Sequence, residues 1–344
     1  MERIYTDQDA DPSILKGETI AVIGYGSQGR AHASNLRDSG CTVVVGARPD
    51  GSAEDRALSD GFRVVVPAEA AREASLLALL TPDMSHREVY EKVIAPNLSP
   101  GAALLVAHGF SVHYGEVDPR PDIDVVLVAP KGPGDLVRRE YEIGRGVPCL
   151  FAVQQDASGE ARARALAYAR GIGGTAAGAI ETDFAEETET DLFGEQAVLC
   201  GGASALVKAG FQTLVDAGYQ PEIAYFECLH ELKLIVDLMY RGGLNYMRYS
   251  VSDTAEHGDY TGGPRIVTEA TRQTMRQMLA EIQNGTYART WIEENAKGRP
   301  AFTATREAEQ QQLLEQVGAR LREMMPFLDP VSAKPSDQAS PTTG

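Results

Sequence analysis

Thr19-Ile-Ala-Val-Ile23 runs directly into Gly24-Tyr-Gly26-Ser-Gln-Gly29, and a helix-like stretch, Arg30–Arg37, follows. The apolar, β-branched run predicts a buried strand, and Cys41–Val45 predicts the next one. A G-x-G-x-x-G pattern is weak evidence alone, but between a strand and a helix it has the context that dinucleotide binding requires. Its glycines permit a tight turn and close approach of the backbone to a pyrophosphate. We therefore predict a dinucleotide-binding loop at 24–29, with a chance glycine turn as the alternative.

The loop after the second strand bears on the choice of dinucleotide. An NAD site usually has Asp or Glu there to hold the ribose hydroxyls. This chain has Gly46-Ala-Arg48-Pro-Asp-Gly-Ser52, in which Arg48 is placed to meet a 2′-phosphate and Ser52 offers a hydroxyl. Negative charge from Asp50, Glu54 and Asp55 opposes a phosphate, and Arg48 could equally be a solvated cation. We expect NADPH in preference to NADH, with NADH as the alternative.

Further strand-like runs at 63–66, 76–80, 102–107, 123–129 and 147–153 alternate with helices or loops. This βα alternation predicts an α/β domain with a mostly parallel, doubly wound sheet. Ligands bind beyond the carboxyl ends of the strands in such sheets. Thr81-Pro-Asp83, His108 and Lys131 follow strand ends, so we expect functional roles there, although His108 could only bond a loop and Lys131 could be solvated.

The second half of the chain changes to long helices, expected at 186–200, 203–217, 222–241, 265–284 and 287–296, with another near 306–325. We place the domain boundary near Thr182, which gives a dinucleotide-binding domain at 1–181 and a helical domain at 182–327. Residues 328–344 end in a stretch rich in Ser, Pro, Thr and Ala, which predicts a disordered tail.

Two of these helices carry carboxylates one turn apart, in Asp191-Leu-Phe-Gly-Glu195 and in Glu227-Cys-Leu-His-Glu231. Residues i and i+4 share a helix face, and the large apolar neighbours predict that both helices are substantially buried. Buried acids at this spacing repel each other unless a cation or a proton compensates. Because Mg²⁺ prefers carboxylate oxygens, we predict that the four acids bind magnesium, with two solvated helix faces as the alternative.

The composition limits the classes of protein. A chain of 344 residues with 43% hydrophobic residues has room for two domains with cores, and a net charge of −17 argues against nucleic acid and anionic membranes as partners. Cys41, Cys149, Cys200 and Cys228 are widely spaced, which favours reduced thiols. The N-terminal residues do not resemble a signal peptide, and no uninterrupted run approaches the ~18 apolar residues of a membrane span. We expect a cytoplasmic protein.

From Tyr5 to about Met325 the chain resembles short-form (class I) ketol-acid reductoisomerases. The stretches that carry the resemblance are Ala21–Gly29, Ala129–Gly134, Glu186–Gln196, Tyr225–Asp237 and Met247–Ser252. The resemblance implies a Rossmann domain followed by a knotted all-helical domain. It also implies an enzyme that uses two Mg²⁺ and a nicotinamide cofactor to convert 2-acetolactate or 2-aceto-2-hydroxybutyrate into 2,3-dihydroxy acids, on the way to valine, leucine and isoleucine.

The resemblance also implies roles for single residues. Asp191 would bridge the two metals and Glu195 would bind one, while Glu227 and Glu231 would complete the site from the partner subunit of a homodimer, with a larger assembly of dimers left open. His108 and Lys131 match active-site residues, and Ser252 matches a serine that contacts substrate. We add the hypothesis that Glu231 takes part in proton transfer. The residues that match cofactor contacts are Gly24, Tyr25, Gly26, Ser27, Gln28, Gly29, Arg48, Asp83 and Gly134, to which Ser52 is added as the remaining loop hydroxyl.

The chain departs from the family pattern at Arg30 and Asp135, where His is usual, and at Gly51 and Ala53, where hydroxyl side chains are usual. These departures concern the cofactor loops and leave the acidic motifs intact. A plain 2-hydroxy-acid or 6-phosphogluconate-type dehydrogenase would need neither paired acids nor Mg²⁺. A non-catalytic cofactor-binding protein is the other alternative, but it would gain nothing from four mutually repelling buried acids.

Overall fold

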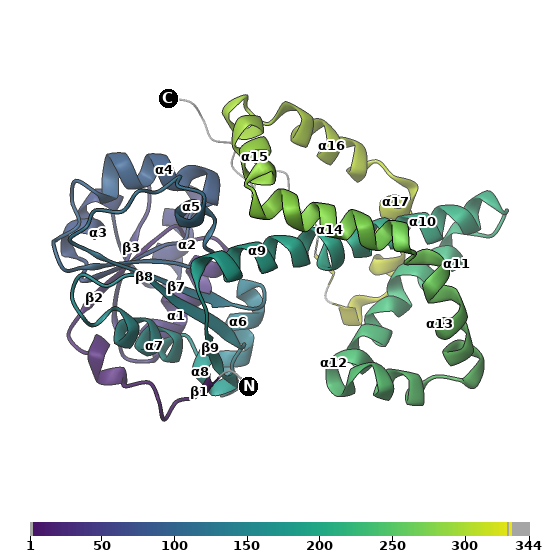
Figure 1. Ribbon diagram of the computed structural model, residues 1–344, viewed down its shortest axis with the longest axis horizontal. Coiled ribbons are helices and arrows are strands. Elements are labelled where there is room, and N and C mark those ends of the chain that lie inside the picture. The colour runs from purple at the N-terminus through teal and green to yellow at the C-terminus, as the bar shows by residue number, and fades with distance from the viewer. Residues whose placement is uncertain (1–2, 329, 332–344) are drawn as a thin grey trace. The chain divides into compact units, whose positions relative to one another are not determined.

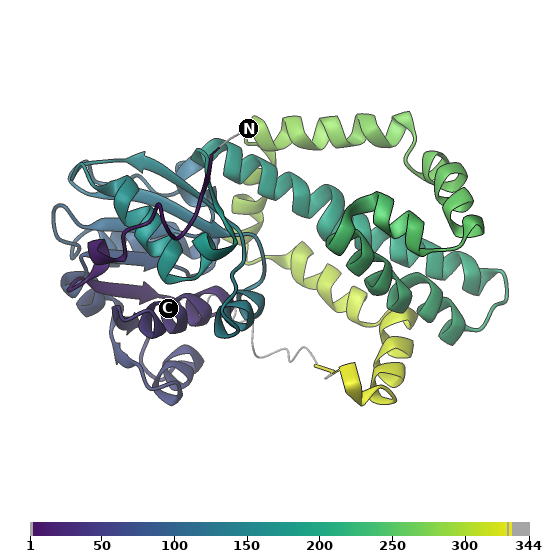
Figure 2. The ribbon, with the colours of Figure 1, turned by 90° about the horizontal axis from the view of Figure 1, so that it is seen from below.

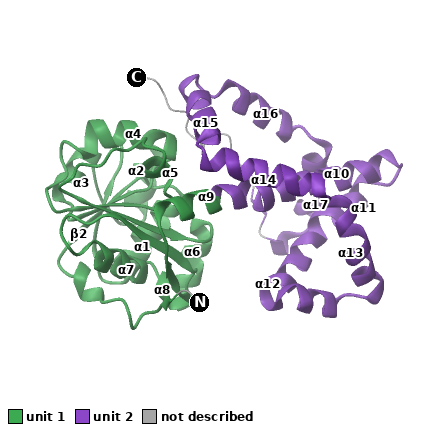
Figure 3. Cartoon of the chain, in the orientation of Figure 1, with its two compact units in different colours: residues 1–191 green, residues 192–344 purple. Residues whose placement is uncertain are grey.

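The computed structural model describes residues 3–328 and 330–331, and Figures 1 and 2 show it in two views. The chain divides into two compact units, Met1–Asp191 and Leu192–Gly344 (Figure 3). The division lies ten residues beyond the expected boundary at 181/182 because α9 (Phe184–Gly194) begins on the first unit: Phe184 belongs to a core of the sheet, and Glu187 and Thr188 are buried. Nearly all of the tail predicted at 328–344 lies outside the described residues.

The first unit is built on a nine-stranded sheet, with the order β1-β9-β8-β7-β6-β5-β2-β3-β4. Neighbouring strands run parallel except for β7 with β8 and β1 with β9, which confirms the doubly wound α/β prediction. The two short strands β1 and β9, which lie at one end of this order, were not predicted. The strands are β1 Ile4–Tyr5, β2 Thr19–Ile23, β3 Thr42–Gly46, β4 Arg63–Val65, β5 Leu76–Leu79, β6 Ala103–Val106, β7 Asp124–Pro130, β8 Cys149–Gln155 and β9 Ala179–Glu181.

Alternate residues of the central strands form two separate cores, as the period of two in a strand requires. Ile20 and Val22 of β2 belong to one core, whereas Ala21 and Ile23 belong to the other. Helices α1 (Ser27–Asp38) and α7 (Ala161–Gly171) cover the first face, and α3 (Pro67–Glu73) and α4 (His86–Val89) lie on the opposite face (Figure 1). With both faces covered, the exposed edge at the strands' carboxyl ends is available for ligands.

Short helices and turns fill the remaining connections of this unit. They are η1 Pro12–Leu15, α2 Ser52–Ser59, η2 Asp83–Ser85, the π-helical turn η3 Tyr90–Ile94, α5 Phe110–His113, α6 Gly134–Glu142 and α8 Gly174–Ala177. Of these, α2, η2, α5 and α6 begin within a few residues of the carboxyl ends of β3, β5, β6 and β7. They therefore carry the loops in which the sequence predicted functional residues.

The second unit is helical throughout its described residues (Figure 2), which confirms the predicted composition of this half. Its elements are η4 Glu195–Leu199, α10 Gly201–Asp216, α11 Pro221–Tyr225, η5 Phe226–His230, α12 Glu231–Ser250, α13 Asp253–Ile266, α14 Glu269–Gln283, α15 Thr286–Ala296, α16 Pro300–Gln310, α17 Leu313–Glu323 and η6 Pro326–Leu328. Helix α13 was not predicted because it contains Gly258, Gly262, Gly263 and Pro264, which are residues of low helix propensity. The single helix expected near 306–325 is two helices, α16 and α17. The knot stays a prediction.

Burial in the second unit differs from the prediction. Glu227 and Glu231 are exposed, and Met247 is the buried residue of α12, whereas the sequence predicted a substantially buried helix. The large apolar side chains Leu199, Tyr240 and Tyr249 are also exposed, by 70%, 89% and 86%. By length and composition alone, one helical run in the described part of the chain, Phe184–Asp216, could cross a membrane, although the core helix of a soluble protein passes the same test.

Candidate functional site

The glycine-rich loop is held by close backbone contacts at the carboxyl edge of the sheet. A Cβ on Gly29 would lie 2.0 Å from the carbonyl oxygen of Gly24, and one on Gly134 would lie 2.2 Å from that of Ser27. Neither contact leaves room for a side chain. The loop after β2 and the loop after β7 therefore meet backbone to backbone, and Gly134 has a structural reason of its own beside its predicted contact with a cofactor.

The side chains of this loop divide into two groups. Tyr25 is only 2% exposed and donates its hydroxyl proton to Asp60, while Gln28 Nε2 donates to the carbonyl oxygen of Gly132 at 2.9 Å. Gly26 and Ser27 are exposed, and the N-terminus of α1 receives no hydrogen bond from a capping side chain. The first amides of α1 are therefore available to a phosphate, as a dinucleotide site requires.

The loop after β3 carries charges of both signs. Arg48 and Ser52 are exposed, and Ser52 is the first residue of α2. The carboxylate of Glu54 accepts a hydrogen bond from the backbone amide of Asp50 at 2.6 Å, where the backbone has a φ of 57°. Arg48 and Ser52 thus suit a 2′-phosphate. The nearby Glu54 adds negative charge and already accepts the hydrogen bond of the Asp50 amide.

Two cations and two carboxylates meet beyond the ends of β6 and β7. Lys131 Nζ lies 2.9 Å from Glu187 Oε1 and 2.9 Å from Asp191 Oδ1. His108 Nδ1 lies 3.1 Å from Glu187 Oε2 and 3.6 Å from Asp191 Oδ2. Glu187, which is 1% exposed, also accepts a hydrogen bond from the amide of Gly109 at 2.9 Å. The structure therefore brings together the predicted residues His108, Lys131 and Asp191 around Glu187.

The positive and negative groups of this cluster stabilise one another's charged forms. Burial alone would lower the pKa of His108, but the hydrogen bond and the charge of Glu187, helped by Asp83 and Asp191, raise it to about 9. Burial likewise opposes the charged forms of Lys131 and Glu187. Their mutual attraction outweighs it, so the pKa of Lys131 is raised and that of Glu187 is lowered. At neutral pH His108 and Lys131 are therefore positively charged and Glu187 is negatively charged.

Glu187 is the functional residue that sequence reasoning missed. It stands four residues before Asp191, as Asp191 stands four before Glu195, so the same i, i+4 spacing that identified the acid pairs extends one turn further. The buried Glu187 side chain joins His108 to Lys131, and neither of those residues is near it in sequence. The sequence therefore carries three acids at this spacing, Glu187, Asp191 and Glu195, of which the prediction used the last two.

The donor set of this cluster suits a metal ion. One ligand atom each from His108, Glu187 and Asp191 lie within 4.8 Å of one another, and no other such group of three occurs in residues 3–328 and 330–331. Glu187 is engaged by three donors, whereas Asp191 is partly exposed and has one oxygen on Lys131. Asp191 is therefore the member of the cluster best placed to offer an oxygen to Mg²⁺.

The remaining predicted residues lie elsewhere. Asp83 begins the short η2 turn after β5, close enough to His108 for its charge to act on that ring. Ser252 is the N-cap of α13 and accepts a hydrogen bond from the amide of Ala255 at 3.2 Å. Glu195 is the first residue of the π-helical turn η4. Glu227 lies in another π-helical turn, η5, which ends at the residue before Glu231. Turns of this kind are frequent at functional sites.

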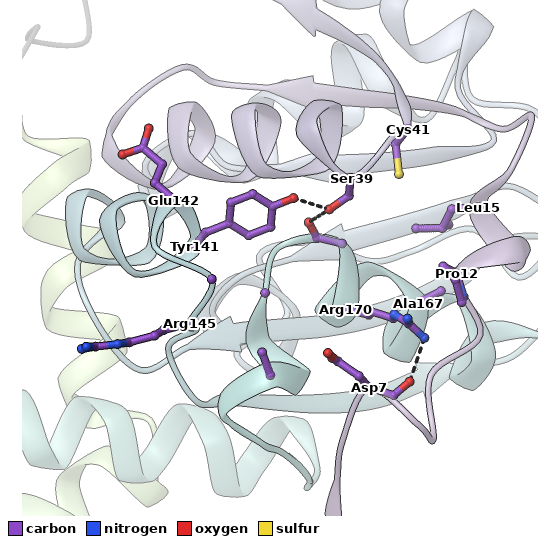
Figure 4. A pocket seen from close by; sticks show the side chains of 14 residues that line it. Asp7, Pro12, Leu15, Ser39, Cys41, Tyr141, Glu142, Arg145, Ala167 and Arg170 are labelled. Carbon is purple, nitrogen blue, oxygen red and sulfur yellow. Dashed lines mark hydrogen bonds between the residues drawn. The ribbon is translucent and has the colours of Figure 1, made fainter.

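A separate hollow of about 590 Å³ lies in the first unit (Figure 4). Its polar side chains are engaged within the fold: Tyr141 Oη lies 2.7 Å from Ser39 Oγ, and Arg170 donates to the carbonyl oxygen of Asp7 at 2.7 Å. Cys41, on its lining, precedes β3, so the hollow reaches the amino end of that strand. None of the predicted site residues lines it, so the hollow is not part of the candidate site.

Comparisons with known proteins agree with this arrangement. Residues 14–178 match the family model "Acetohydroxy acid isomeroreductase, NADPH-binding domain", and residues 184–327 match "Ketol-acid reductoisomerase, C-terminal domain". The chain is 43% identical to an NADH-preferring ketol-acid reductoisomerase from an uncultured archean, whose structure superimposes with a TM-score of 0.92 over 94% of this chain and 99% of that one.

More distant structures share the fold alone. An NAD-binding semialdehyde dehydrogenase protein from Cupriavidus necator is 20% identical, with a TM-score of 0.60 over 78% of this chain and 99% of that one. A putative oxidoreductase from Jannaschia sp. is 18% identical, with a TM-score of 0.59 over 77% and 97% of the two chains.

Proposed function

The chain belongs to the ketol-acid reductoisomerase family, and from this premise we propose how its own residues carry out the reaction. In that reaction an alkyl group migrates within 2-acetolactate or 2-aceto-2-hydroxybutyrate. Hydride from a nicotinamide cofactor then reduces the resulting 2-keto acid to a 2,3-dihydroxy acid, a step of branched-chain amino acid biosynthesis. The observation that carries the proposal is the cluster of His108, Lys131, Glu187 and Asp191 at the same sheet edge as the glycine-rich loop.

Asp191 and Glu195 are the residues of this chain that we propose to hold Mg²⁺, together with Glu227 and Glu231 of the second acid motif. Carboxylate oxygens are the ligands that Mg²⁺ prefers, and Asp191 is partly exposed. Its neighbours His108 and Lys131 are protonated, and in that form neither can bind the metal ion. When bound, Mg²⁺ supplies Lewis-acid polarisation of the ketone and the neighbouring hydroxyl.

His108 and Lys131 are the proposed proton-holding groups. Glu187 engages the Nδ1–H of His108, which leaves Nε2–H as the atom that can donate to a substrate oxygen. Lys131 Nζ is held between Glu187 and Asp191 and can keep one of its protons for the carboxylate or keto oxygen of the substrate. Glu231 keeps its proposed part in proton transfer. Replacing it by Gln should slow the alkyl shift or the reduction of the 2-keto acid when each is assayed separately, and two unchanged rates would remove that role.

We propose NADPH as the preferred cofactor, by a modest margin. Arg48 and Ser52 are exposed in the loop that would meet a 2′-phosphate. The Glu54 carboxylate, which binds the Asp50 amide, opposes the charge of that phosphate, so NADH is also used. Comparing kcat/KM for NADPH and NADH in the native enzyme and in Arg48→Ala tests this. The preference for NADPH should disappear in Arg48→Ala, whereas a native enzyme that favours NADH would contradict the proposal.

We propose that a second copy of the chain completes the site. Glu227 and Glu231 are exposed on a unit that also exposes Leu199, Tyr240 and Tyr249. We take these large exposed apolar side chains as part of the surface that a second copy of the chain covers. A second subunit is enough to cover these side chains, so the proposal involves no membrane and no nucleic acid. We propose a cytoplasmic enzyme whose substrate is a small 2-keto acid.

Mixing two inactive variants tests the shared site. In a dimer of Asp191→Asn and Glu227→Gln chains, one of the two sites would have both acids intact if each site takes Asp191 from one chain and Glu227 from the other. Random reassociation should then restore about a quarter of native activity, since about half of the dimers are mixed. No recovery in a mixture shown to have exchanged subunits would contradict the shared site.

The activity itself is tested by turnover of 2-acetolactate with NADPH or NADH. We expect dihydroxy acid formation that is lost with a chelator and restored by Mg²⁺. Activity that persists in full after chelation would favour a plain dehydrogenase on this fold and contradict the proposal.

A further inference from the structure

Asp60, the C-cap residue that follows α2, contacts several side chains near the glycine-rich loop. Its Oδ2 accepts a hydrogen bond from the buried hydroxyl of Tyr25 at 2.9 Å and from Nε of Arg30 at 2.7 Å, and its Oδ1 accepts from Nη2 of Arg30 at 2.9 Å. Its backbone carbonyl oxygen accepts from Arg37 at 2.7 Å. Hydrogen bonds therefore hold both carboxylate oxygens of Asp60 and its backbone carbonyl at the end of the helix.

The partners of Asp60 come from one helix and from the loop that precedes it. Arg30 and Arg37 stand seven residues apart in α1, so two helical turns place them on the same face. The Arg37 guanidinium lies 4.2 Å from the centre of the Phe62 ring, which packs edge-on against Tyr25. The hydrogen bond from Arg30 keeps the pKa of Asp60 below its usual value, so the carboxylate is charged throughout the physiological range.

A second contact joins the same two elements. Arg56, one turn before Asp60 in α2, reaches the carbonyl oxygen of Tyr25 at 3.4 Å. Tyr25 is therefore bound to α2 through its hydroxyl and its backbone. Because α2 is a single helix of eight residues, fixing its last turn against the glycine-rich loop also fixes its first residue, Ser52, and the loop from Arg48 that leads into it.

We propose that Asp60 is a positioning residue for the adenosine half of the nicotinamide cofactor. Through Tyr25 and Arg30 it sets the separation between the glycine-rich loop, which receives the pyrophosphate, and the loop 48–52, which receives the adenosine ribose. The inference rests on the dinucleotide site of the proposed function. It also gives a reason for arginine at position 30, because a guanidinium can bind both carboxylate oxygens at once.

The test measures binding of ADP-ribose by calorimetry in the full chain. This probe carries the adenosine and the pyrophosphate but no nicotinamide, and it needs neither Mg²⁺ nor a keto acid. A failed reductoisomerase assay and a failed positioning role are therefore separate results. The variants are Asp60→Asn and Arg30→Gln, of which the second alters an exposed side chain and should fold even if the first does not.

We expect Kd for ADP-ribose to rise about tenfold in both variants, since a displaced loop loses well-aligned contacts. Arg30→Lys, which keeps the charge and one donor, should recover most of the affinity. The control is Glu73→Gln, which breaks a similar two-pronged pair with Arg63 in the same domain without touching the glycine-rich loop. It should lower Tm but leave Kd unchanged. A Kd within twofold of the native value in Arg30→Gln, with the fold intact by circular dichroism, would overturn the proposal.

Discussion

Replacing Glu187 by Gln is the most informative single change in the candidate site. The side chain is 1% exposed and accepts hydrogen bonds from His108, from the amide of Gly109 and from Lys131. Glutamine has the same shape but one acceptor oxygen, and its other terminal atom is a donor. If the amide oxygen keeps the bonds to His108 and Gly109, the new NH₂ group faces Lys131 Nζ across 2.9 Å, donor to donor.

The magnitude follows from these contacts. A hydrogen bond to a charged group contributes about 1.5–3 kcal/mol, and removing one partner of a buried ion pair costs about 3–5 kcal/mol. Lys131 is one-third exposed and keeps Asp191 as a partner, so solvent and the second carboxylate reduce the loss. We expect a fall of about 2–3 kcal/mol in the free energy of unfolding, and a fall of roughly a hundredfold in kcat if the displaced Lys131 is needed in the transition state.

Two assays measure these effects. Urea unfolding gives the stability, and steady-state kinetics with 2-acetolactate and with the 2-keto acid intermediate separate the alkyl shift from the reduction. The matched control is Glu186→Gln, which changes the exposed neighbouring acid. If Glu187→Gln were no more damaging than Glu186→Gln in either assay, Glu187 would not organise His108 and Lys131 as we describe.

Three further predictions concern stability and binding. Burial lowers the pKa of His32 to about 4, so between pH ~6.5 and ~4 the unfolded chain binds a proton that the folded chain excludes. The free energy of unfolding should therefore fall by about 2 kcal/mol from pH 7 to pH 5. A His32→Gln variant with an unchanged dependence of stability on pH would refute this. Gly134→Ala forces a Cβ to 2.2 Å from the Ser27 carbonyl and should weaken cofactor binding at least ~10-fold, while Gly258→Ala, at an open helical position, should be neutral or slightly stabilising; equal Kd values in the two variants would contradict the close contact. Asp191→Asn should abolish nearly all turnover of 2-acetolactate yet leave the Kd for NADPH within about threefold, and substantial residual turnover would argue against Asp191 as a metal ligand.

The sheet was predictable because its inner strands are apolar runs, several of them rich in β-branched residues, that alternate with helices and loops. Strands β1 and β9, at one end of the sheet, have two and three residues, which is too short for a period to be recognised in the sequence. The glycine-rich loop was found for the same reason as the sheet. The inward direction of Tyr25 and Gln28 was not, since Asp60 and Gly132 are 35 and 104 residues away in sequence.

The prediction of burial was wrong where a helix face stays exposed in the part of the chain that the structure describes. Apolar residues around Glu227 and Glu231 indicate that the helix face is covered, but their pattern is the same whether the cover is this chain or a second copy. The acid spacing itself was informative, and extending it by one turn would have included Glu187. Contacts between distant segments, such as Lys131 with Glu187, become visible only when the fold brings the strand ends together.

Magnesium uptake tests the central claim most directly. The full chain, with NADPH present, is titrated with MgCl₂ in a calorimeter beside the Asp191→Asn variant. The account predicts saturable uptake by the native protein, approaching two ions for each chain, and uptake that is largely lost in the variant. A native protein that takes up no magnesium, with or without the cofactor, would contradict it.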